Sequence, residues 1–352
     1  MARSVRERIV DVRRVLAAAQ RVYDDREALV DALVAATGLT PPGVELGFAS
    51  LERTASDDEL RSLVQAAGVA RHVHVVLSAN VFVAPLRALA LARAAADRVT
   101  LRASPRDPVL ARAIVEALED PAVTLVDERD IARTDADSVH VYARDETIAQ
   151  VRAQARHDAI VVGHGAGLGV ALVTSGADVA QAAADLARDV AAFDQRGCLS
   201  PRIALVEGDL ERATSFARQL TAALDDFAIR VPRGRLLADE AADAARWRDA
   251  AAFAGDLFPG AAHAVGVAAG EALLVPPSGR HLQVHAVPTL VAASRILAPL
   301  ARQIVTVGSD AREATTRLAL PHARTSLLGH MQRPPLDGPV DRRPASRAHP
   351  LA

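Results

Sequence analysis

The sequence predicts an α/β protein built around parallel β-sheets. Between residues 70 and 165, short β-branched runs alternate with helical stretches of about 10–15 residues, the pattern of βαβ units. A second alternation of this kind begins near residue 195. Half of the 352 residues are hydrophobic and 24% are charged, which is typical of globular proteins. A chain of this length is enough for about two domains.

The expected elements follow in chain order. Residues 1–70 predict helices, because apolar side chains recur at helical spacing (Ile9, Val12, Leu16, Ala19 and Val22). The first sheet is predicted to have strands at 73–77, 99–101, 123–126, 139–142 and 159–162, with helices at 83–96, 107–118 and from 145. A long helix at 178–193 then leads to strands at 203–206, 272–275 and 282–287, with a helix at 209–225.

These elements predict four parts of the chain. They are an N-terminal helical segment (1–70), a nucleotide-binding domain (71–193), a catalytic domain (194–306) and a C-terminal segment (307–352). The tail after residue 333 is rich in Pro and Arg, and we expect an arm or a disordered end there. Asp107 and Pro108 are the expected N-cap and first residue of one helix.

Composition excludes several classes of function. All 41 basic residues are arginine, so mechanisms that need a lysine, such as the P-loop or a Schiff base to pyridoxal phosphate, are excluded. The net charge of -2 provides no general attraction to nucleic acid or anionic membranes. No run of about 18 uncharged apolar residues occurs, and the N-terminus lacks a signal-peptide core. We therefore expect a cytoplasmic protein with no membrane span and no nucleic-acid partner.

Cys198 is the only cysteine. Because a single thiol can form neither an internal disulfide nor a Cys-rich zinc site, both are excluded, and no metal site is predicted. The residue lies in a polar helix-to-strand turn, where Arg196 and Arg202 would favour the reactive thiolate. A buried small hydrophobic residue is the alternative interpretation.

Polar loops follow three of the predicted strands, at residues 78–80, 102–104 and 143–145. In open parallel sheets, ligands bind beyond the carboxyl ends of the strands. These loops therefore predict a ligand-binding edge of the first sheet.

The segment Asp194-Gln195-Arg196-Gly197-Cys198-Leu199-Ser200-Pro201 resembles the Asp-Gln-x-x-Cys-Ser-Ser-Pro nucleophile motif of the LuxC family of acyl-CoA reductases, within the aldehyde dehydrogenase superfamily. Four further segments resemble motifs of that family in the same order: Asp145–Ile148, Gly163–Gly165, Thr306–Gly308 and Gly329–Leu336. The resemblance runs from about residue 70 to residue 342. It implies an aldehyde dehydrogenase-like fold, with a nucleotide-binding parallel-sheet domain and a catalytic α/β domain.

The resemblance also implies a reaction, the NADPH-dependent reduction of an acyl-CoA to an aldehyde through an acyl-cysteine on Cys198. The expected substrate is a fatty acyl-CoA. Asn80 would stabilise the oxyanion, and His164 would act as acid and base because imidazole titrates near neutral pH. His164 stands where hydrolytic members of the superfamily have a glutamate, and no glutamate occurs between residues 147 and 198. For both Asn80 and His164, the alternative is a turn residue without a catalytic role.

The expected cofactor-binding residues lie at the predicted strand ends: Arg102, Ser104, Arg144, Asp145, Glu146 and Thr147. Ala143 and Arg144 replace the family's Gly-Ser, so side chains stand where close approach to the phosphate is expected. Two guanidiniums, Arg102 and Arg144, favour NADPH over NADH because they could pair with a 2′-phosphate. The alternative for Arg144 is a solvated arginine at a helix start. Arg280 is a further candidate contact to the cofactor.

The same residues are also compatible with other functions. One is an aldehyde dehydrogenase or an acyl-phosphate reductase that uses the same cysteine. Another is a non-catalytic family member that acts as an interaction subunit, which the altered Ala143-Arg144 sequence would explain. The expected partners are acyl-CoA as substrate and either further copies of the chain or another enzyme of fatty-aldehyde metabolism.

Overall fold

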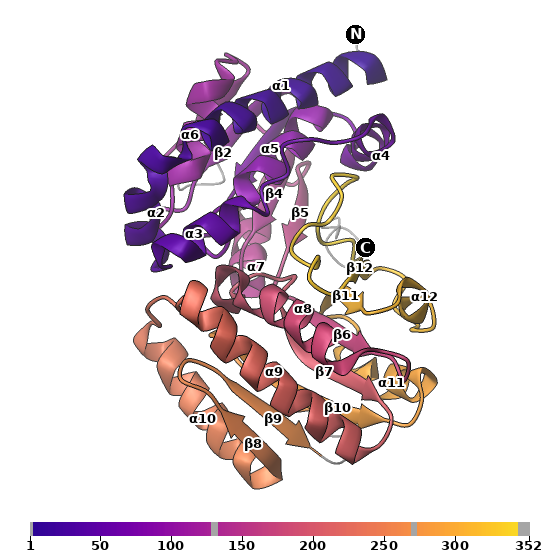
Figure 1. Cartoon of the computed structure of the whole chain (residues 1–352). Coiled ribbons are helices and arrows are strands. Elements are labelled where there is room, and N and C mark those ends of the chain that lie inside the picture. Colours follow the sequence, from indigo (N-terminus) through magenta and orange to yellow (C-terminus); the bar gives the residue numbers. More distant parts are fainter. Residues whose placement is uncertain (1–2, 128–132, 269–272, 344–352) are drawn as a thin grey trace. The chain divides into compact units, whose positions relative to one another are not determined.

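The computed structural model describes residues 3–127, 133–268 and 273–343 (Figure 1). The chain divides into two compact units, each with its own β-sheet. Unit 1 comprises residues 1–37, 47–166 and 335–352, and unit 2 comprises residues 38–46 and 167–334. The α/β class is therefore confirmed. The four-part division of the chain stays a prediction.

Unit 1 combines N-terminal helices with a parallel sheet. Its helices are α1 (Val5–Asp24), η1 (Arg26–Leu29), α2 (Val30–Thr37), α4 (Asp57–Ala67), α5 (Ala84–Ala95), α6 (Val109–Leu118) and α7 (Asp145–Gln154). Its strands are β1 (Ala70–Val76), β2 (Ala96–Arg102), β3 (Val123–Leu125), β4 (Ser138–Tyr142) and β5 (Ile160–His164). The strand order is β3-β2-β1-β4-β5, and every pairing is parallel. Helix α3 (Pro41–Phe48) begins in unit 2 and ends in unit 1.

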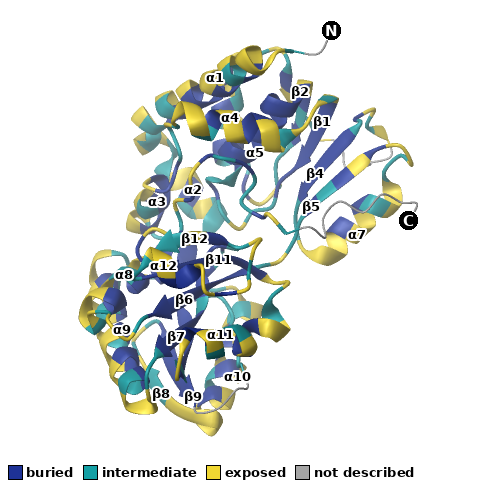
Figure 2. Ribbon diagram, turned by 90° about the vertical axis from the view of Figure 1, so that its right-hand side faces the viewer, coloured by how far each residue is buried: buried dark blue, intermediate teal, exposed yellow. Residues whose placement is uncertain are grey.

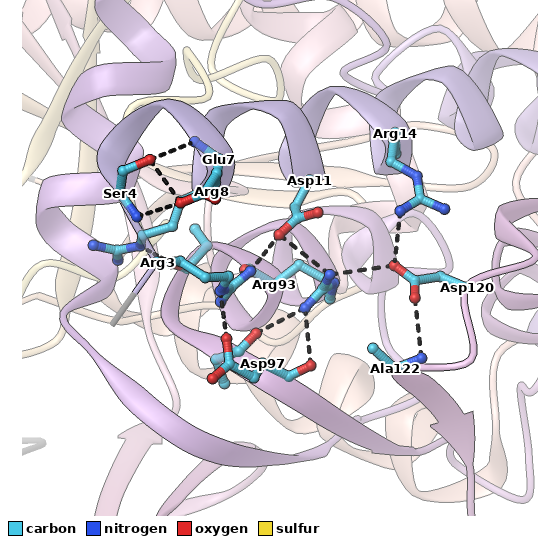
Figure 3. Close-up of polar contacts among 12 residues, drawn as sticks. Arg3, Ser4, Glu7, Arg8, Asp11, Arg14, Arg93, Asp97, Asp120 and Ala122 are labelled. Atoms are coloured by element: carbon cyan, nitrogen blue, oxygen red, sulfur yellow. Dashed lines mark hydrogen bonds and ion pairs between the residues drawn. The ribbon is translucent and has the colours of Figure 1, made fainter. Parts of the chain in front are cut away.

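Helix α1 is fixed to the rest of unit 1 by charged side chains as well as by apolar ones. A capping box between Ser4 and Glu7 starts the helix. Arg93 of α5 then lies between two carboxylates, 3.2 Å from Asp11 of α1 and 3.2 Å from Asp120, as Figure 3 shows. Because all three side chains are largely buried, removal of one would leave an uncompensated charge. Helix α1 is thus an integral part of unit 1.

Unit 2 contains a larger, mixed sheet. Its helices and short turns are α8 (Val179–Ala191), η3 (Ala192–Gln195), α9 (Leu210–Arg230), α10 (Ala238–Ala254), α11 (Leu290–Leu297), η4 (Ala298–Leu300) and α12 (Arg312–Thr315). Its strands are β6 (Leu168–Val173), β7 (Pro201–Glu207), β8 (Gly255–Pro259), β9 (Ala264–Ala268), β10 (His281–Val287), β11 (Ile304–Ser309) and β12 (Arg324–Leu327). The order is β12-β11-β6-β7-β10-β9-β8, with only β8 antiparallel to its neighbour.

The core of unit 2 lies on both faces of this sheet. Strands β6, β7 and β10 are buried along nearly their whole length. Figure 2 shows β6 and β7 mostly in the colour of buried residues. Helices α8 and α9 cover one face, where Leu186, Phe216 and Leu220 pack against Ala204 and Val284. Helix α11 covers the other face. Burial on both faces explains why these strands have continuous apolar sequences.

The predicted strand at 272–275 is wrong for its described residues, 273–275, which form no strand. They lead into Pro276 and Pro277, which have no N–H groups to donate to a sheet. The carbonyl of Leu274 instead accepts a hydrogen bond from the Trp247 indole at 3.3 Å. The strand beside β10 at this end of the sheet is β9, and the edge strand is β8; both precede that segment in the chain.

Two further expectations need correction. Helix α6 begins at Val109 with Pro108 as its N-cap, so the predicted N-cap, Asp107, lies one residue before the observed cap. The expected arm or disordered end after residue 333 is also wrong for its described part, because Leu336 is 1% exposed and residues 335–343 pack within unit 1. In the described residues, no helix is long and apolar enough to span a membrane.

Candidate active site

The predicted ligand-binding edge exists in unit 1. Strands β2, β1 and β4 are neighbours, so the loops that follow them meet at one edge of the sheet. Asn80 is exposed after β1, Arg102 is half-buried at the end of β2, and Arg144 is exposed after β4. The chain runs from β1 outwards to β3 and then returns to β4 on the other side of β1. This topological switch point is where open α/β sheets bind nucleotides.

The first turn of α7 carries the other predicted cofactor residues. Arg144 is the N-cap, and Asp145, Glu146 and Thr147 are exposed. The Asp145 carboxylate accepts a hydrogen bond from the Ala166 N–H at 3.3 Å. A Cβ atom at Gly165 would lie 2.0 Å from Asp145 Oδ1, so glycine is required there for this contact. Two guanidiniums and a helix N-terminus at one edge fit an anionic dinucleotide such as NADPH.

Ser104 lies in a tight loop after β2. Its carbonyl accepts the Asp107 N–H at 3.1 Å, and its hydroxyl accepts the Arg106 N–H at 3.4 Å. Burial raises the pKa of Asp107 to about 6. The loop is therefore held by its own backbone, with Ser104 half-buried beside Arg102 on the ligand-binding edge.

His164 ends β5 in unit 1. Its ring stacks on Tyr142 with centroids 4.2 Å apart and planes 9° apart. Its Nε2 atom is buried and has no hydrogen-bond partner among the residues that the structure describes. Burial, as the largest cause, lowers the pKa of His164 to about 4. The imidazole is therefore neutral at physiological pH, and the expected titration near neutrality is not what this environment supports.

Cys198 lies in unit 2, between α8 and β7. The three residues Phe193, Asp194 and Gln195 have left-handed backbone conformations, with φ of 55°, 48° and 65°. Consecutive left-handed non-glycine residues are strained by about 1 kcal/mol or more each. Such a turn persists only where surrounding contacts impose it.

Two motif side chains supply those contacts. The Asp194 carboxylate is 1% exposed and accepts from Nε of Arg280 at 2.9 Å, while its other oxygen accepts the Gly234 N–H at 2.9 Å. The Gln195 amide donates to the carbonyls of Pro201 and His281 at 2.7 and 2.6 Å and accepts the His281 N–H at 2.8 Å. Asp194 and Gln195 of the motif thus bind the cysteine turn (residues 193–200) to the start of β10. Arg280, 2% exposed, belongs to this clamp rather than to an exposed cofactor surface.

The thiol itself is half-buried at the amino-terminal edge of the unit 2 sheet. Its turn closes with a hydrogen bond from the Ser200 N–H to the Gly197 carbonyl at 3.1 Å. The Gly169 N–H donates to the Ser200 carbonyl at 2.9 Å, and a Cβ atom at Gly169 would lie 2.5 Å from the Leu199 carbonyl. Glycine at 169 therefore allows β6 to approach the cysteine turn.

The two arginines expected to favour the thiolate have other contacts. The Arg196 guanidinium donates to both carboxylate oxygens of Glu240, at 2.9 and 3.0 Å. Arg202 donates to the Pro276 carbonyl at 2.8 Å, and burial lowers its pKa to about 10. Both remain charged at neutral pH, and Arg202 has no ion-pair partner among the described residues.

A buried carboxylate that sequence reasoning missed holds a second turn of unit 2, at residues 329–331. Asp189 of α8, 1% exposed, accepts the N–H groups of Gly329 at 2.6 Å and Met331 at 3.0 Å. Burial raises the pKa of Asp189 to about 7. The Met331 side chain fills the space left by two glycines, Gly169 and Gly308. The sequence does contain a signal for this residue: Asp189 lies three positions after Leu186, so it falls on the apolar face of the helix.

The structure thus groups the predicted residues in two sets. Asn80, the cofactor candidates and His164 belong to unit 1, whereas Cys198 belongs to unit 2. Within unit 1, the strand order brings together Asn80, Arg102, Ser104 and the start of α7.

Solved structures with this fold include several dehydrogenases. An NAD-dependent benzaldehyde dehydrogenase from Corynebacterium glutamicum matches with a TM-score of 0.70 and 13% identity, over 91% of this chain and 81% of that one. A second match is the NADP-dependent glyceraldehyde-3-phosphate dehydrogenase from Bacillus halodurans C-125, solved with NADP. Its TM-score is 0.66 and its identity 15%, over 96% of this chain and 80% of that one. A lactaldehyde dehydrogenase matches with a TM-score of 0.68 and 16% identity, over 95% of this chain and 80% of that one. The chain therefore has the fold of the aldehyde dehydrogenase superfamily.

The family can be stated more closely. The profile of the family described as acyl-CoA reductase (LuxC) matches residues 45–333, and the chain belongs to this oxidoreductase family. The predicted resemblance is thereby confirmed. Compared by sequence with curated proteins, the chain has no match.

Proposed function

We propose that the protein reduces an acyl-CoA to the corresponding aldehyde, with Cys198 as nucleophile and NADPH as reductant. The observation that carries the proposal is the clamped, strained turn that presents a single half-buried cysteine, in a chain of the acyl-CoA reductase family. A fatty acyl-CoA is the substrate class that we infer from the family resemblance.

The first step forms an acyl-enzyme. The Cys198 thiolate attacks the thioester carbonyl, a C–S bond forms, and the carbonyl π electrons move to oxygen. We assign stabilisation of this oxyanion to the Asn80 amide and the backbone N–H of Cys198, at about 3 kcal/mol per donor. The oxyanion collapses and the bond to the coenzyme A sulfur breaks. Coenzyme A leaves as its thiolate and takes up a proton, which leaves an acyl-cysteine.

The second step is reduction of this thioester. Bound NADPH supplies a hydride, and Arg102, Ser104, Arg144 and the start of α7 are the residues that would hold it. The reduced carbon carries an oxyanion, which is protonated to a thiohemiacetal. Loss of that proton and cleavage of the C–S bond then give the aldehyde and regenerate Cys198. Burial lowers the pKa of His164 to about 4, which keeps the imidazole unprotonated but makes it a weak base. We assign to it the transfer of the thiol proton as the C–S bond forms, and the return of that proton later.

A direct test uses a panel of acyl-CoA thioesters of increasing chain length with NADPH. The proposal expects aldehyde, free coenzyme A and NADP⁺ in equal amounts, with one chain-length class preferred. Coenzyme A release without aldehyde would instead indicate a thioesterase or transferase. Release of no coenzyme A from any member of the panel would favour the non-catalytic alternative.

The cofactor preference gives one prediction. NADPH should bind at least about tenfold more tightly than NADH, because a charged hydrogen bond to the 2′-phosphate contributes about 1.5–3 kcal/mol. Arg144→Ala should remove most of this difference and leave NADH binding nearly unchanged. Fluorescence titration measures both constants, with Arg106→Ala, an exposed arginine of the β2 loop, as the matched control. Tighter binding of NADH by the unmodified protein would refute the prediction.

The role of His164 gives another prediction. His164→Ala should slow acyl transfer by about 10²–10⁴-fold, the usual contribution of a general acid–base group. Since the pKa is about 4, the imidazole is unprotonated from pH 5.5 to 7.5, so the loss should be the same across this range. Single-turnover acylation measures it, with the exposed His157→Ala as control. A loss that shrinks several-fold towards pH 5.5 would show an imidazole that titrates near neutrality.

A further inference from the structure

Residues 335–343 form a C-terminal strap that is an ordered part of unit 1. The guanidinium of Arg87 on α5 is buried and donates to two strap carbonyls, Pro335 at 3.0 Å and Gly338 at 2.7 Å. Leu336 is buried as well. The strap is therefore fixed at its beginning by α5, before it reaches the strands of the sheet.

The end of the strap lies on the turn that follows His164. Arg343 donates to the carbonyls of Ala166 at 2.9 Å and Gly165 at 3.4 Å. The same guanidinium pairs with both carboxylate oxygens of Asp341, at 2.8 and 2.7 Å. Asp341 is 9% exposed. A planar guanidinium suits this arrangement, because it can bind a carboxylate and two carbonyls at fixed angles.

We propose that the strap is a positioning device for the candidate acid–base residue, in which Arg343, held by the Asp341 carboxylate, fixes the 164–166 turn that carries His164. The proposal rests on the function proposed above, in which His164 transfers protons. It assigns roles to two residues outside the motifs that identify the family, since Asp341 and Arg343 follow the Gly329–Leu336 segment.

The groups around His164 support this assignment. Tyr142 stacks on the ring and His140 lies 6.2 Å away, both from β4. From α7, Asp145 binds the Ala166 N–H and Arg152 reaches Gly163. The charges that act on the imidazole come from the strap: Asp341 raises the pKa of His164 and Arg343 lowers it, against the larger lowering by burial.

The neighbouring residue provides a matched control. Arg342 carries the same charge and comes from the same strap, but it is exposed and pairs with Asp337 at 2.7 Å. A variant at Arg342 changes the net charge of the strap without removing a contact to the 164–166 turn. Effects of general charge or of strap folding would therefore appear in both arginine variants.

The decisive experiment titrates His164 in the full-length protein by NMR with labelled histidine, using His164→Ala to assign the signal. Asp341→Asn should lower the pKa of His164, and Arg343→Met should raise it, by about half a pH unit or more. Arg342→Ala should leave it unchanged. Equal pKa values in the unmodified protein and in both strap variants would overturn the proposal. Asp341→Asn is nearly isosteric, so it decides the question even if Arg343→Met does not fold.

Acyl transfer gives the second readout. Arg343→Met should slow single-turnover acylation of Cys198 about tenfold, and it should have little further effect in the His164→Ala background, because both changes remove the same proton transfer. Full additivity of the two variants would contradict the proposal. If acyl-CoA does not acylate Cys198 in the unmodified protein, the proposed function fails, and the NMR titration still decides the role of the strap.

Discussion

Cys198→Ala should abolish aldehyde formation, with turnover reduced by at least about 10⁴-fold, the scale of loss when a catalytic nucleophile is removed. Only the thiolate can hold the acyl group between release of coenzyme A and reduction, and the chain has no second cysteine. The fold should remain, because the half-buried thiol contributes little to the core. Coupled assay of NADPH oxidation and aldehyde measures the loss, and circular dichroism checks the fold.

The matched variant is Ser200→Ala, two residues from the cysteine. It removes a buried hydroxyl that has no hydrogen-bond partner in the described part of the chain. It should retain most of the activity. Undiminished aldehyde formation by Cys198→Ala would exclude an acyl-cysteine mechanism.

Arg280→Met should destabilise the protein by about 3–5 kcal/mol, the cost of leaving one member of a buried ion pair without its partner. The Asp194 carboxylate would keep only the Gly234 N–H at 2.9 Å and a longer contact to Arg196 at 3.9 Å. Since this carboxylate holds the left-handed turn before Cys198, the rate of thiol alkylation should also change. Urea unfolding and iodoacetamide kinetics measure the two effects.

Arg246→Ala is the control, because Arg246 and Asp243 form an exposed ion pair on α10, and such pairs contribute little to stability. In the double variant Asp194→Asn with Arg280→Met, part of the loss should be recovered, because no unpaired charge remains. A single Arg280→Met variant as stable as the unmodified protein would show that the clamp is not required.

The sequence predicts those parts of the fold that depend on local pattern. The five strands of unit 1 were all expected, because β-branched runs between helices have a distinct period. Three adjacent strand ends were expected to carry the ligand-binding edge, and the order β2-β1-β4 confirms that they are neighbours. The family follows from short motifs whose residues lie at fixed spacing.

The remaining features depend on contacts between residues far apart in the chain. Asp194 and Arg280 are 86 positions apart, and Asp189 and Met331 are 142 apart, so no local pattern could pair them. The segment after 333 has the composition of a flexible tail, yet Arg87, 248 positions earlier than Pro335, binds it within unit 1. The low pKa of His164 likewise follows from burial, which a glycine-rich sequence does not reveal.

The proposed function depends above all on transfer of the acyl group from acyl-CoA to Cys198. Intact-protein mass spectrometry after incubation with an acyl-CoA panel, without NADPH, tests it most directly. We expect a mass increase equal to one acyl group, located on the peptide that contains Cys198. The increase should be lost on addition of NADPH and absent from Cys198→Ala. No adduct with any acyl-CoA, or an adduct that persists in Cys198→Ala, would contradict it.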